Sequence, residues 1–317
     1  MGAGTAPDLA VATGLPAQPS EFARVWRRFR HDRVALASLA FVVLLVLVAV
    51  FAPLLVQWLG VPGPNVQDPS ATNAFGLPLG PDAAHPFGVD GLGRDVLART
   101  LYGTRTALVV GLASALLATA VAVVVGVVAG YCGGWVDTLL SRFVDVMLSF
   151  PVLLLGLGLA SACSLGDGCI GGTIRPGTTM VVLVIALVTW SYGARLIRGQ
   201  VLSLRTREFV EAARSLGASG PRIVFREILP HLSAPIIVSA SVLAPVAIML
   251  EAALSYLGVG VGSGTSSWGQ MIADATPTFD TAWWGVAFPG TALLLTVLAF
   301  NLLGDGLEDA LNPKEEK

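Results

Sequence analysis

Residues 34–58 read VALASLAFVVLLVLVAVFAPLLVQW, a run that contains no charged side chain. A helix needs about 20 consecutive apolar residues to cross the hydrocarbon core of a bilayer, so this run is long enough to span one. It is about twice as long as the apolar region of a secretory signal, and no small-residue cleavage pattern follows it. We therefore expect residues 34–59 to remain in the protein as its first membrane helix.

The composition of the whole chain also indicates a membrane protein. The chain is 54% hydrophobic and 13% charged, whereas soluble domains have about 25% charged residues. The formal net charge is −2, and no basic tract indicates a nucleic-acid partner. Five more apolar runs predict an all-α integral membrane protein with six spans. These runs are 106–131, 139–162, 178–196, 234–257 and 283–303.

The segments between the apolar runs predict tails and loops. Residues 1–33 are expected to form a disordered cytoplasmic tail with a basic flank, and residues 306–317 a second cytoplasmic tail. Residues 60–104 are expected to form an external loop. Its final part, 92–104, has apolar residues at helical spacing, which predicts a short helix lying along the outer surface.

The distribution of Lys and Arg predicts the orientation, because cytoplasmic loops are enriched in these residues. If the N-terminus lies inside, four of the 19 basic residues fall outside and fifteen fall on the cytoplasmic side. The four are Arg94, Arg99, Arg105 and Arg175. Both termini are therefore expected to face the cytoplasm.

The largest cytoplasmic element is the loop 198–232. A helix is expected over 200–216, followed by a break at 217–221, because Gly ends helices and Pro begins them. A second helix, 222–229, is expected to stop at Pro230, and Ser233 is expected to cap the fifth span. The small residues Ala212, Ala213 and Gly217 would let another protein approach the first helix closely. The alternative from the residues alone is a solvated amphipathic linker.

Glu211-Ala212-Ala213-x-x-x-Gly217, followed by Leu229-Pro230, resembles the EAA motif of binding-protein-dependent ABC importer permeases. The motif normally has an apolar residue where this chain has Glu227. Nine further segments resemble the dipeptide, oligopeptide and nickel branch of that family. They are 85–90, 92–97, 133–137, Arg142 with Asp145, 150–151, 198–200, 251–258, 267–269 and 301–306.

The resemblance implies a type I ABC importer permease with a MetI-like five-helix core, 105–305, and a peripheral first helix. It implies the second permease subunit of a dipeptide importer in a bacterial cell membrane, with nickel or another small ligand as the alternative cargo. A homologous permease, two ATP-binding subunits and an extracytoplasmic solute-binding protein are the implied partners. The residues implied to couple to the ATPase are Glu211, Ala212, Ala213, Leu216, Gly217, Leu229 and Pro230.

Catalysis is not expected from this chain. Lys occurs only at 314 and 317, so the chain contains no Gly-Lys-Ser/Thr phosphate-binding loop, and ATP and Mg²⁺ are expected on partner subunits. A membrane enzyme is a weaker alternative, because no G-x-S-x-G elbow is present. A gradient-driven transporter is also weaker, because no inverted repeat is evident. No cofactor is expected on this chain.

Four ionisable or aromatic residues are candidates for a transport pathway or a gate. Arg142 and Asp145 lie three apart on one helical face and are expected to pair with each other or with a neighbouring helix. Glu251 lies toward the outer end of the fifth span, where it could line a cavity or bind a neighbouring helix. Trp268 lies in a long Gly-rich segment that could fold partly back, either to contact the external solute-binding protein or to gate the outer mouth of the pore.

Cysteine and histidine positions give three further predictions. Cys163 and Cys169 flank an outer loop, where a disulfide between them is possible. Cys132 is expected to be free. The three His residues are scattered and no C-x-x-C is present, so no metal site is expected.

Overall fold

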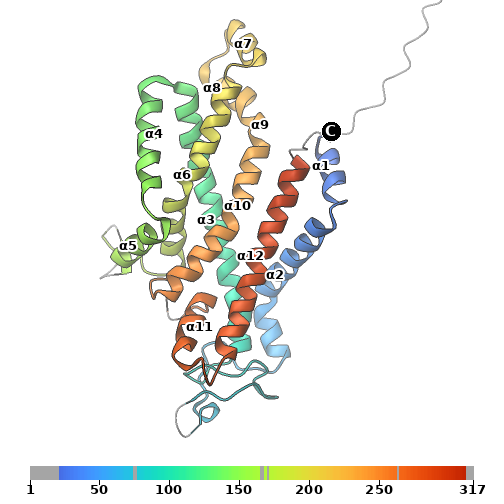
Figure 1. The fold of residues 1–317 in the computed structure, drawn as a ribbon, viewed down its shortest axis with the longest axis vertical. Coiled ribbons are helices and arrows are strands. Elements are labelled where there is room, and N and C mark those ends of the chain that lie inside the picture. Colours follow the sequence, from blue (N-terminus) through green and yellow to red (C-terminus); the bar gives the residue numbers. More distant parts are fainter. Residues whose placement is uncertain (1–20, 74–76, 165–167, 170, 263, 312–317) are drawn as a thin grey trace, which may run out of the picture.

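A computed structural model describes residues 21–73, 77–164, 168–169, 171–262 and 264–311 (Figure 1). These residues form helices and connecting loops, with only isolated β-bridges. Five of the described helices are long and apolar enough to cross a membrane, and one bent pair could form a sixth span. The five are α2 (Arg33–Trp58), α3 (Val96–Cys132), α6 (Thr178–Leu204), α10 (Ser233–Tyr256) and α12 (Trp284–Leu311).

The long helices run side by side, so the bundle has two ends (Figure 1). One end carries α7 (Glu208–Ser215) and the other carries α11 (Trp268–Ala275); we call them the α7 end and the α11 end. In the most apolar stretch of α6, 67% of the residues are buried inside the protein, whereas in the corresponding stretch of α2 only 22% are buried. Helix α6 is therefore central, and α2 presents most of its apolar surface outward.

The predicted surface helix 92–104 is wrong as a separate element. Helix α3 is continuous from Val96, and its N-cap Asp95 accepts a hydrogen bond from the Ala98 N–H at 2.7 Å. The apolar face of this first part packs on α11 instead of on lipid. Gly103 allows the contact, because a Cβ there would lie 2.7 Å from the Trp268 ring. The segment is thus the buried beginning of a 37-residue helix.

The predicted third span, 139–162, is wrong as a single helix. It consists of α4 (Gly134–Ser149) and α5 (Val152–Ser164), which meet at 88°. Phe150 between them is extended, with φ −87° and ψ 135°. The cause is Pro151, since the ring of a proline disfavours the helical conformation in the residue before it. Helix α5 therefore turns away from the direction of α4 (Figure 1).

Both predicted tails contain helix. Residues 21–29 form α1 (Glu21–Phe29), so the expectation of disorder is wrong for this part of the N-terminal tail, and α12 continues into the predicted C-terminal tail as far as Leu311. The buried Phe29 ring packs with Ala35 and Ala310, which joins the two terminal segments at the α7 end. Residues 1–20 and 312–317 lie outside the described residues.

Small residues let α3 and α6 approach closely. A Cβ on Gly126 would lie 2.8 Å from the Ala194 carbonyl oxygen, and one on Gly130 would lie 2.8 Å from the Val201 Cβ. In a membrane, packing of this kind holds helices together because lipid chains are as apolar as the side chains. The pair α3 and α6 is therefore the centre of the bundle, and the loop that follows α6 starts from it.

Candidate functional site

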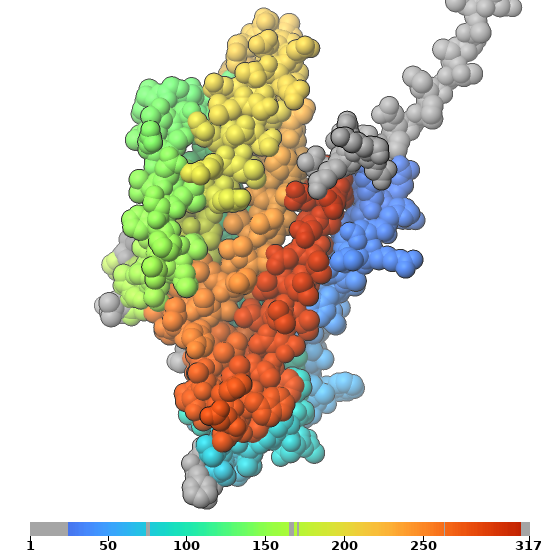
Figure 2. All heavy atoms as spheres, in the orientation of Figure 1, coloured from blue at the N-terminus to red at the C-terminus, as the bar shows by residue number. Residues whose placement is uncertain are grey.

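The connection between α6 and α10 is a folded unit that we call the α7 loop, residues 205–232. It contains α7, α8 (Gly220–Ile223), a π-helical turn (Val224–Ile228) and α9 (Leu229–His231). Figure 2 shows it, mainly in yellow, standing beyond the neighbouring helix ends. The expected helix 200–216 is in fact two helices, because α6 ends at Leu204 and α7 begins at Glu208.

The α7 loop has its own apolar core. Val210 of α7 is fully buried, and so are Ile223, Ile228 and Leu232 from the returning segment. They pack on the buried ends of α3 and α6, represented by Val127, Ile197 and Val201. This burial opposes the alternative of a solvated linker, because a linker would have no shared core with the bundle.

Gly217 ends α7 in a left-handed conformation, with φ +82°. Its N–H donates to the Arg214 carbonyl and the Ala218 N–H donates to the Ala213 carbonyl, both at 3.0 Å. This is the Schellman arrangement, in which an αL residue, usually Gly, follows the helix end. A Cβ at Gly217 would meet no atom within 4 Å, so the requirement for Gly lies in the backbone and not in space.

The expectation that the second helix stops at Pro230 is wrong. The Leu229 N–H donates to the Val224 carbonyl within the π turn, and the chain runs through α9 almost directly into α10. Pro230 stands at the start of α9, where the first N–H groups of a helix have no intrahelical partner, so its missing donor costs little. Ser233 is not a cap either, since its hydroxyl donates to the Pro230 carbonyl at 2.8 Å.

Two side chains, Arg205 and His231, make further contacts that hold the α7 loop in place. The Arg205 guanidinium donates from Nη1 to the Gly130 carbonyl of α3 at 3.0 Å. The His231 ring stacks on Phe209 of α7 with a centroid distance of 4.7 Å, and its Nδ1 lies 2.6 Å from the Glu227 carbonyl oxygen. The loop is therefore attached both to the bundle and across itself.

The structure divides the predicted coupling residues between a surface and a core. Glu211, Ala212, Leu216 and Gly217 are exposed and form what we call the α7 face. Leu216 is 89% exposed, the highest value among the exposed large apolar side chains of the described residues. In the described chain the Glu211 carboxylate has no hydrogen-bond or ion-pair partner.

The other three predicted coupling residues have different surroundings. Ala213 and Leu229 are half-buried and pack on the core of the α7 loop, so they support its shape. Pro230, the second residue of α9, is exposed. Only part of the motif is thus available to contact another protein.

Asp145 pairs mainly with a neighbouring helix. Its Oδ1 lies 2.6 Å from Nη2 of Arg195 on α6, whereas Arg142 Nη1 lies 4.0 Å from its other oxygen. The Arg142 side chain is 80% exposed. A second pair went unpredicted: Asp137 of α4 accepts from Nε and Nη2 of Arg198 at 2.5 and 2.7 Å. The two pairs join α4 to α6, and a cavity of about 140 Å³ lies between these helices and α3.

Glu251 is fully buried and hydrogen-bonded. It accepts from the hydroxyls of Ser255 at 2.7 Å and Ser267 at 2.8 Å, so it joins α10 to the segment before α11. Of the two roles considered for it, the structure supports a bond between elements and not the lining of a cavity. Both hydroxyls donate to the same oxygen, Oε1, and hydrogen bonds of this kind lower the cost of burying a polar group in a membrane helix.

Trp268 is only 1% exposed. Its indole N–H donates to the Thr100 carbonyl of α3 at 3.0 Å. The Gly-rich segment therefore does fold back on the bundle, and Trp268 fixes it there. In this conformation the side chain occupies the core of the α11 end and does not stand free at a pore mouth.

A network of charged side chains at the α11 end was not predicted as a unit. Asp90 accepts from Arg94 Nε at 2.7 Å and also pairs with Arg99 Nη1. Arg94 Nη2 lies 3.1 Å from Asp274 of α11. We call these four residues, Asp90, Arg94, Arg99 and Asp274, the outer cap. Burial makes the network strongly dependent on each partner, because an unpaired buried charge is costly.

The loop around the outer cap is held by two more contacts. His85 Nδ1 lies 2.8 Å from the Asp95 carboxylate, and the Trp284 indole N–H donates to the Val89 carbonyl at 3.0 Å. His85 thus has a structural partner. Among the described residues, no group of three or more His, Cys, Asp or Glu side chains could hold a metal ion.

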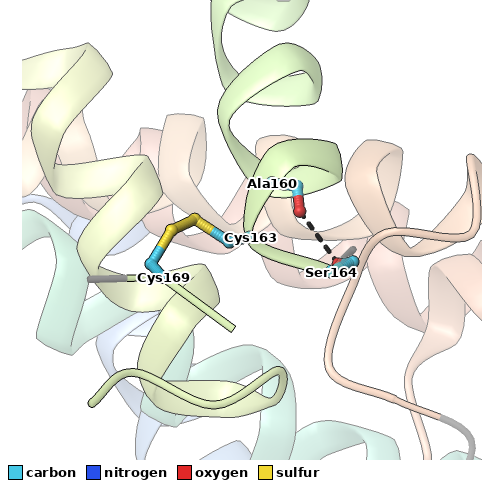
Figure 3. The surroundings of a disulfide bond; sticks show 4 residues. All are labelled: Ala160, Cys163, Ser164 and Cys169. Atoms are coloured by element: carbon cyan, nitrogen blue, oxygen red, sulfur yellow. Dashed lines mark hydrogen bonds between the residues drawn. A yellow bond between two sulfur atoms is a disulfide. The ribbon is translucent and has the colours of Figure 1, made fainter. Parts of the chain in front are cut away.

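Cys163 and Cys169 form a disulfide, with their Cα atoms 4.6 Å apart (Figure 3). The bond joins the last turn of α5 to the segment that leads into α6. In that last turn of α5, the Ser164 hydroxyl also donates to the Ala160 carbonyl at 2.8 Å. Cys132, at the other end of the bundle, is free and exposed. The disulfide predicted as possible is therefore present.

Two family descriptions match the chain. Residues 122–317 match the binding-protein-dependent transport system inner membrane component, and residues 20–75 match the N-terminal transmembrane domain of oligopeptide transport permease C.

Several curated proteins are similar over nearly the full length. The dipeptide transport system permease protein DppC of Alkalihalophilus pseudofirmus is 36% identical, over 93% of this chain and 90% of the relative. The oligopeptide permease OppC of Bacillus subtilis is 35% identical over 92% and 88%. The glutathione permease GsiD of Escherichia coli is 38% identical over 91% and 89%.

A solved structure supports the fold. An inward-facing MetNI methionine ABC transporter aligns with a TM-score of 0.55 at 18% identity, covering 68% of this chain and 96% of that chain.

Proposed function

This chain belongs to the family of binding-protein-dependent transport system inner membrane components, and we propose that it imports dipeptides or short oligopeptides as one half of a pore. The similar permeases are named for dipeptide, oligopeptide and glutathione transport, and they support a peptide cargo because all three of these substrates are peptides. We further propose that the chain carries no catalytic site and that separate subunits bind ATP and Mg²⁺.

The observation that carries the mechanism is the α7 loop. Its exposed α7 face presents Leu216 and an unpaired Glu211, which suit a helix lying in the groove of an ATPase. The core beneath it is shared with α3 and α6, so a displacement of α7 would move these helices rather than bend a linker. In this mechanism the ATPases open and close the pore through two such loops, one on this chain and one on a homologous permease.

The proposed orientation puts the α7 end in the cytoplasm and the α11 end outside. The Lys and Arg distribution supports it, and so does the disulfide, because disulfides persist in oxidising compartments. The solute-binding protein would then deliver cargo at the α11 end, and both termini would be cytoplasmic.

The experiment is reconstitution of the chain with its partner permease, its ATPases and its binding protein in proteoliposomes. We expect uptake of a labelled dipeptide that requires ATP and stops without the binding protein. Glu211→Arg should release the ATPase, because it reverses a charge on the α7 face. Glu308→Arg, an exposed carboxylate near the end of α12, is the matched control and should keep the ATPase bound.

Three results would contradict the proposal. One is peptide uptake by this chain alone, driven by a proton gradient. Another is ATP-dependent uptake of nickel without uptake of peptides, which would change the cargo and leave the coupling intact. The third is equal ATPase retention by Glu211→Arg and wild type, which would remove the α7 face from the docking contact.

A further inference from the structure

A cavity of about 390 Å³ opens at the α11 end, between α3, the start of α6 and the loop before α11. This volume is within the range of roughly 300–1,000 Å³ that is usual for small-molecule sites. Its rim is fixed by Asn65, whose side-chain N–H donates to the Gly264 carbonyl at 3.0 Å. None of its described lining residues is acidic. The polar ones include Tyr102, Arg105, Thr106, Thr178 and Ser266.

Arg105 is the only basic residue among the described lining residues. Arg94 and Arg99, by contrast, are buried in the outer cap. In the described chain Arg105 is exposed and has no hydrogen-bond or ion-pair partner. Its charge is therefore free to meet an anion.

Arg105 also lines a second cavity, of about 380 Å³ and largely apolar, together with Val46, Ala49 and Val50 from the middle of α2. An arginine beside the apolar side chains of membrane helices is costly unless it meets water or a counter-charge. We conclude that Arg105 faces a wet passage or a ligand, and the polar cavity provides the place for either.

The N-terminus of α6 adds to the positive field. Gly177 caps this 27-residue helix without a side-chain acceptor, and Thr178, its first residue, lines the cavity. The first N–H groups of a helix have no intrahelical partners, and they favour an anion together with the helix dipole. Two independent sources of positive potential thus point to the same cavity.

We propose that this cavity is the entry site for the peptide and that Arg105 binds its terminal carboxylate. The inference rests on the proposed peptide cargo. A dipeptide such as alanyl-alanine has one anionic group, and a guanidinium binds a carboxylate through two parallel N–H donors. The neighbouring hydroxyl groups are suited to the peptide's amide groups.

The first test is uptake of alanyl-alanine by the reconstituted complex at subsaturating concentrations of loaded binding protein. Arg105→Gln should lower uptake about tenfold, the loss expected when one charge-assisted contact is removed. Arg105→Lys should keep part of the activity. Arg175→Gln is the matched control, because it removes an exposed arginine from the segment just before α6, outside the cavity, and should have no effect.

The second test restores the charge chemically. Arg105→Cys is made together with Cys132→Ser, which removes the free thiol and leaves the disulfide. A thiosulfonate that attaches an ammonium group should restore most of the uptake, whereas a neutral reagent of the same size should not. Repeating the assay in vesicles without anionic lipid should give the same result.

The outcomes separate the two proposals. If the wild-type complex takes up no dipeptide, the proposed function fails and this inference fails with it. If it does, the inference alone is overturned by equal uptake in Arg105→Gln and Arg175→Gln, or by equal rescue with the neutral reagent. Loss of the effect in neutral vesicles, or failure of Arg105→Gln to assemble with the partner permease, would also overturn it, assigning Arg105 to lipid or to that subunit.

Discussion

The Arg205 guanidinium lies against the end of α3, where it donates to the Gly130 carbonyl at 3.0 Å. Gly130 is also the residue that lets α3 approach Val201 of α6. A single side chain of the α7 loop is thus attached at the point where the two central helices meet. This contact gives a movement of α7 a direct route into α3.

Arg205→Ala should therefore weaken coupling more than docking. We expect the ATPase to remain bound, and the number of peptides imported per ATP hydrolysed to fall severalfold, because a hydrogen bond to a charged group is worth roughly 1.5–3 kcal/mol. Arg207→Ala, an exposed neighbour, is the control. If both variants keep the wild-type ratio of transport to hydrolysis, the Arg205 contact does not transmit movement.

Gly217→Ala should destabilise the α7 loop through the backbone. An L-residue in the left-handed region costs roughly 1–2 kcal/mol, and φ at Gly217 is +82°. Gly199→Ala in α6, which also meets no atom within 4 Å, should be neutral or slightly stabilising. Amide hydrogen exchange of α7 measures the difference, and equal exchange in both variants would refute a role for the Schellman turn.

Leu216→Ala and Val210→Ala should distinguish the docking role of the exposed α7 face from the structural role of the core beneath it. Leu216 is 89% exposed and Val210 is fully buried. The first variant should lose ATPase affinity with an unchanged melting temperature. The second should lose about 1–3 kcal/mol of stability, as core truncations do. Co-purification and thermal unfolding measure the two effects, and a stability loss in Leu216→Ala would argue against the α7 face.

Arg99→Leu should disrupt the outer cap. It leaves the buried Asp90 with one guanidinium partner in place of two, and breaking a buried ion pair costs up to about 3–5 kcal/mol. Asp274→Asn should cost less, because the Asp274 side chain is 37% exposed. Thermal unfolding in detergent compares the melting temperatures of the two variants, and Arg99→Leu should have the lower one. A lower melting temperature in Asp274→Asn would mean that the network is not held together by Asp90.

Cys163→Ser should remove the constraint between α5 and the segment before α6. The chain-entropy relation gives roughly 2 kcal/mol for so short a loop. Cys132→Ser should leave stability unchanged, because that thiol is free and exposed. A reducing agent should lower the melting temperature of wild type but not of Cys163→Ser. An identical response of both proteins to reduction would exclude a stabilising role for this bond.

Much of the fold could be predicted because long apolar runs have few alternatives in a bilayer. The bend at Pro151 was missed because mostly apolar residues continue on both sides of it, from Val146 to Phe150 and from Val152 onward, so no polar segment marks a boundary there. At Pro230 the sequence predicted a helix end, but the π turn before it lets the helical path continue through this residue. Local signals show where a helix can break, whereas packing determines whether it does.

The coupling role assigned to the EAA segment stays a prediction, and the structure adds contacts around it that the sequence did not indicate. The pairs Asp137–Arg198 and Arg99–Asp274 could not be predicted, because their partners lie far apart in the sequence and meet only when the helices pack. Arg105 was recognised as an outer basic residue, but only the structure shows that it lacks a partner in the described chain.

The direct passage from α9 into α10 has a mechanical consequence. No slack segment separates the α7 loop from the helix whose far end carries Glu251. We expect the two to move as one rigid unit, so a displacement of α7 would reach the Ser255 and Ser267 hydroxyls at the α11 end. The hydrogen bonds that join α10 to the segment before α11 are thus carried by the same continuous element as the proposed ATPase contact.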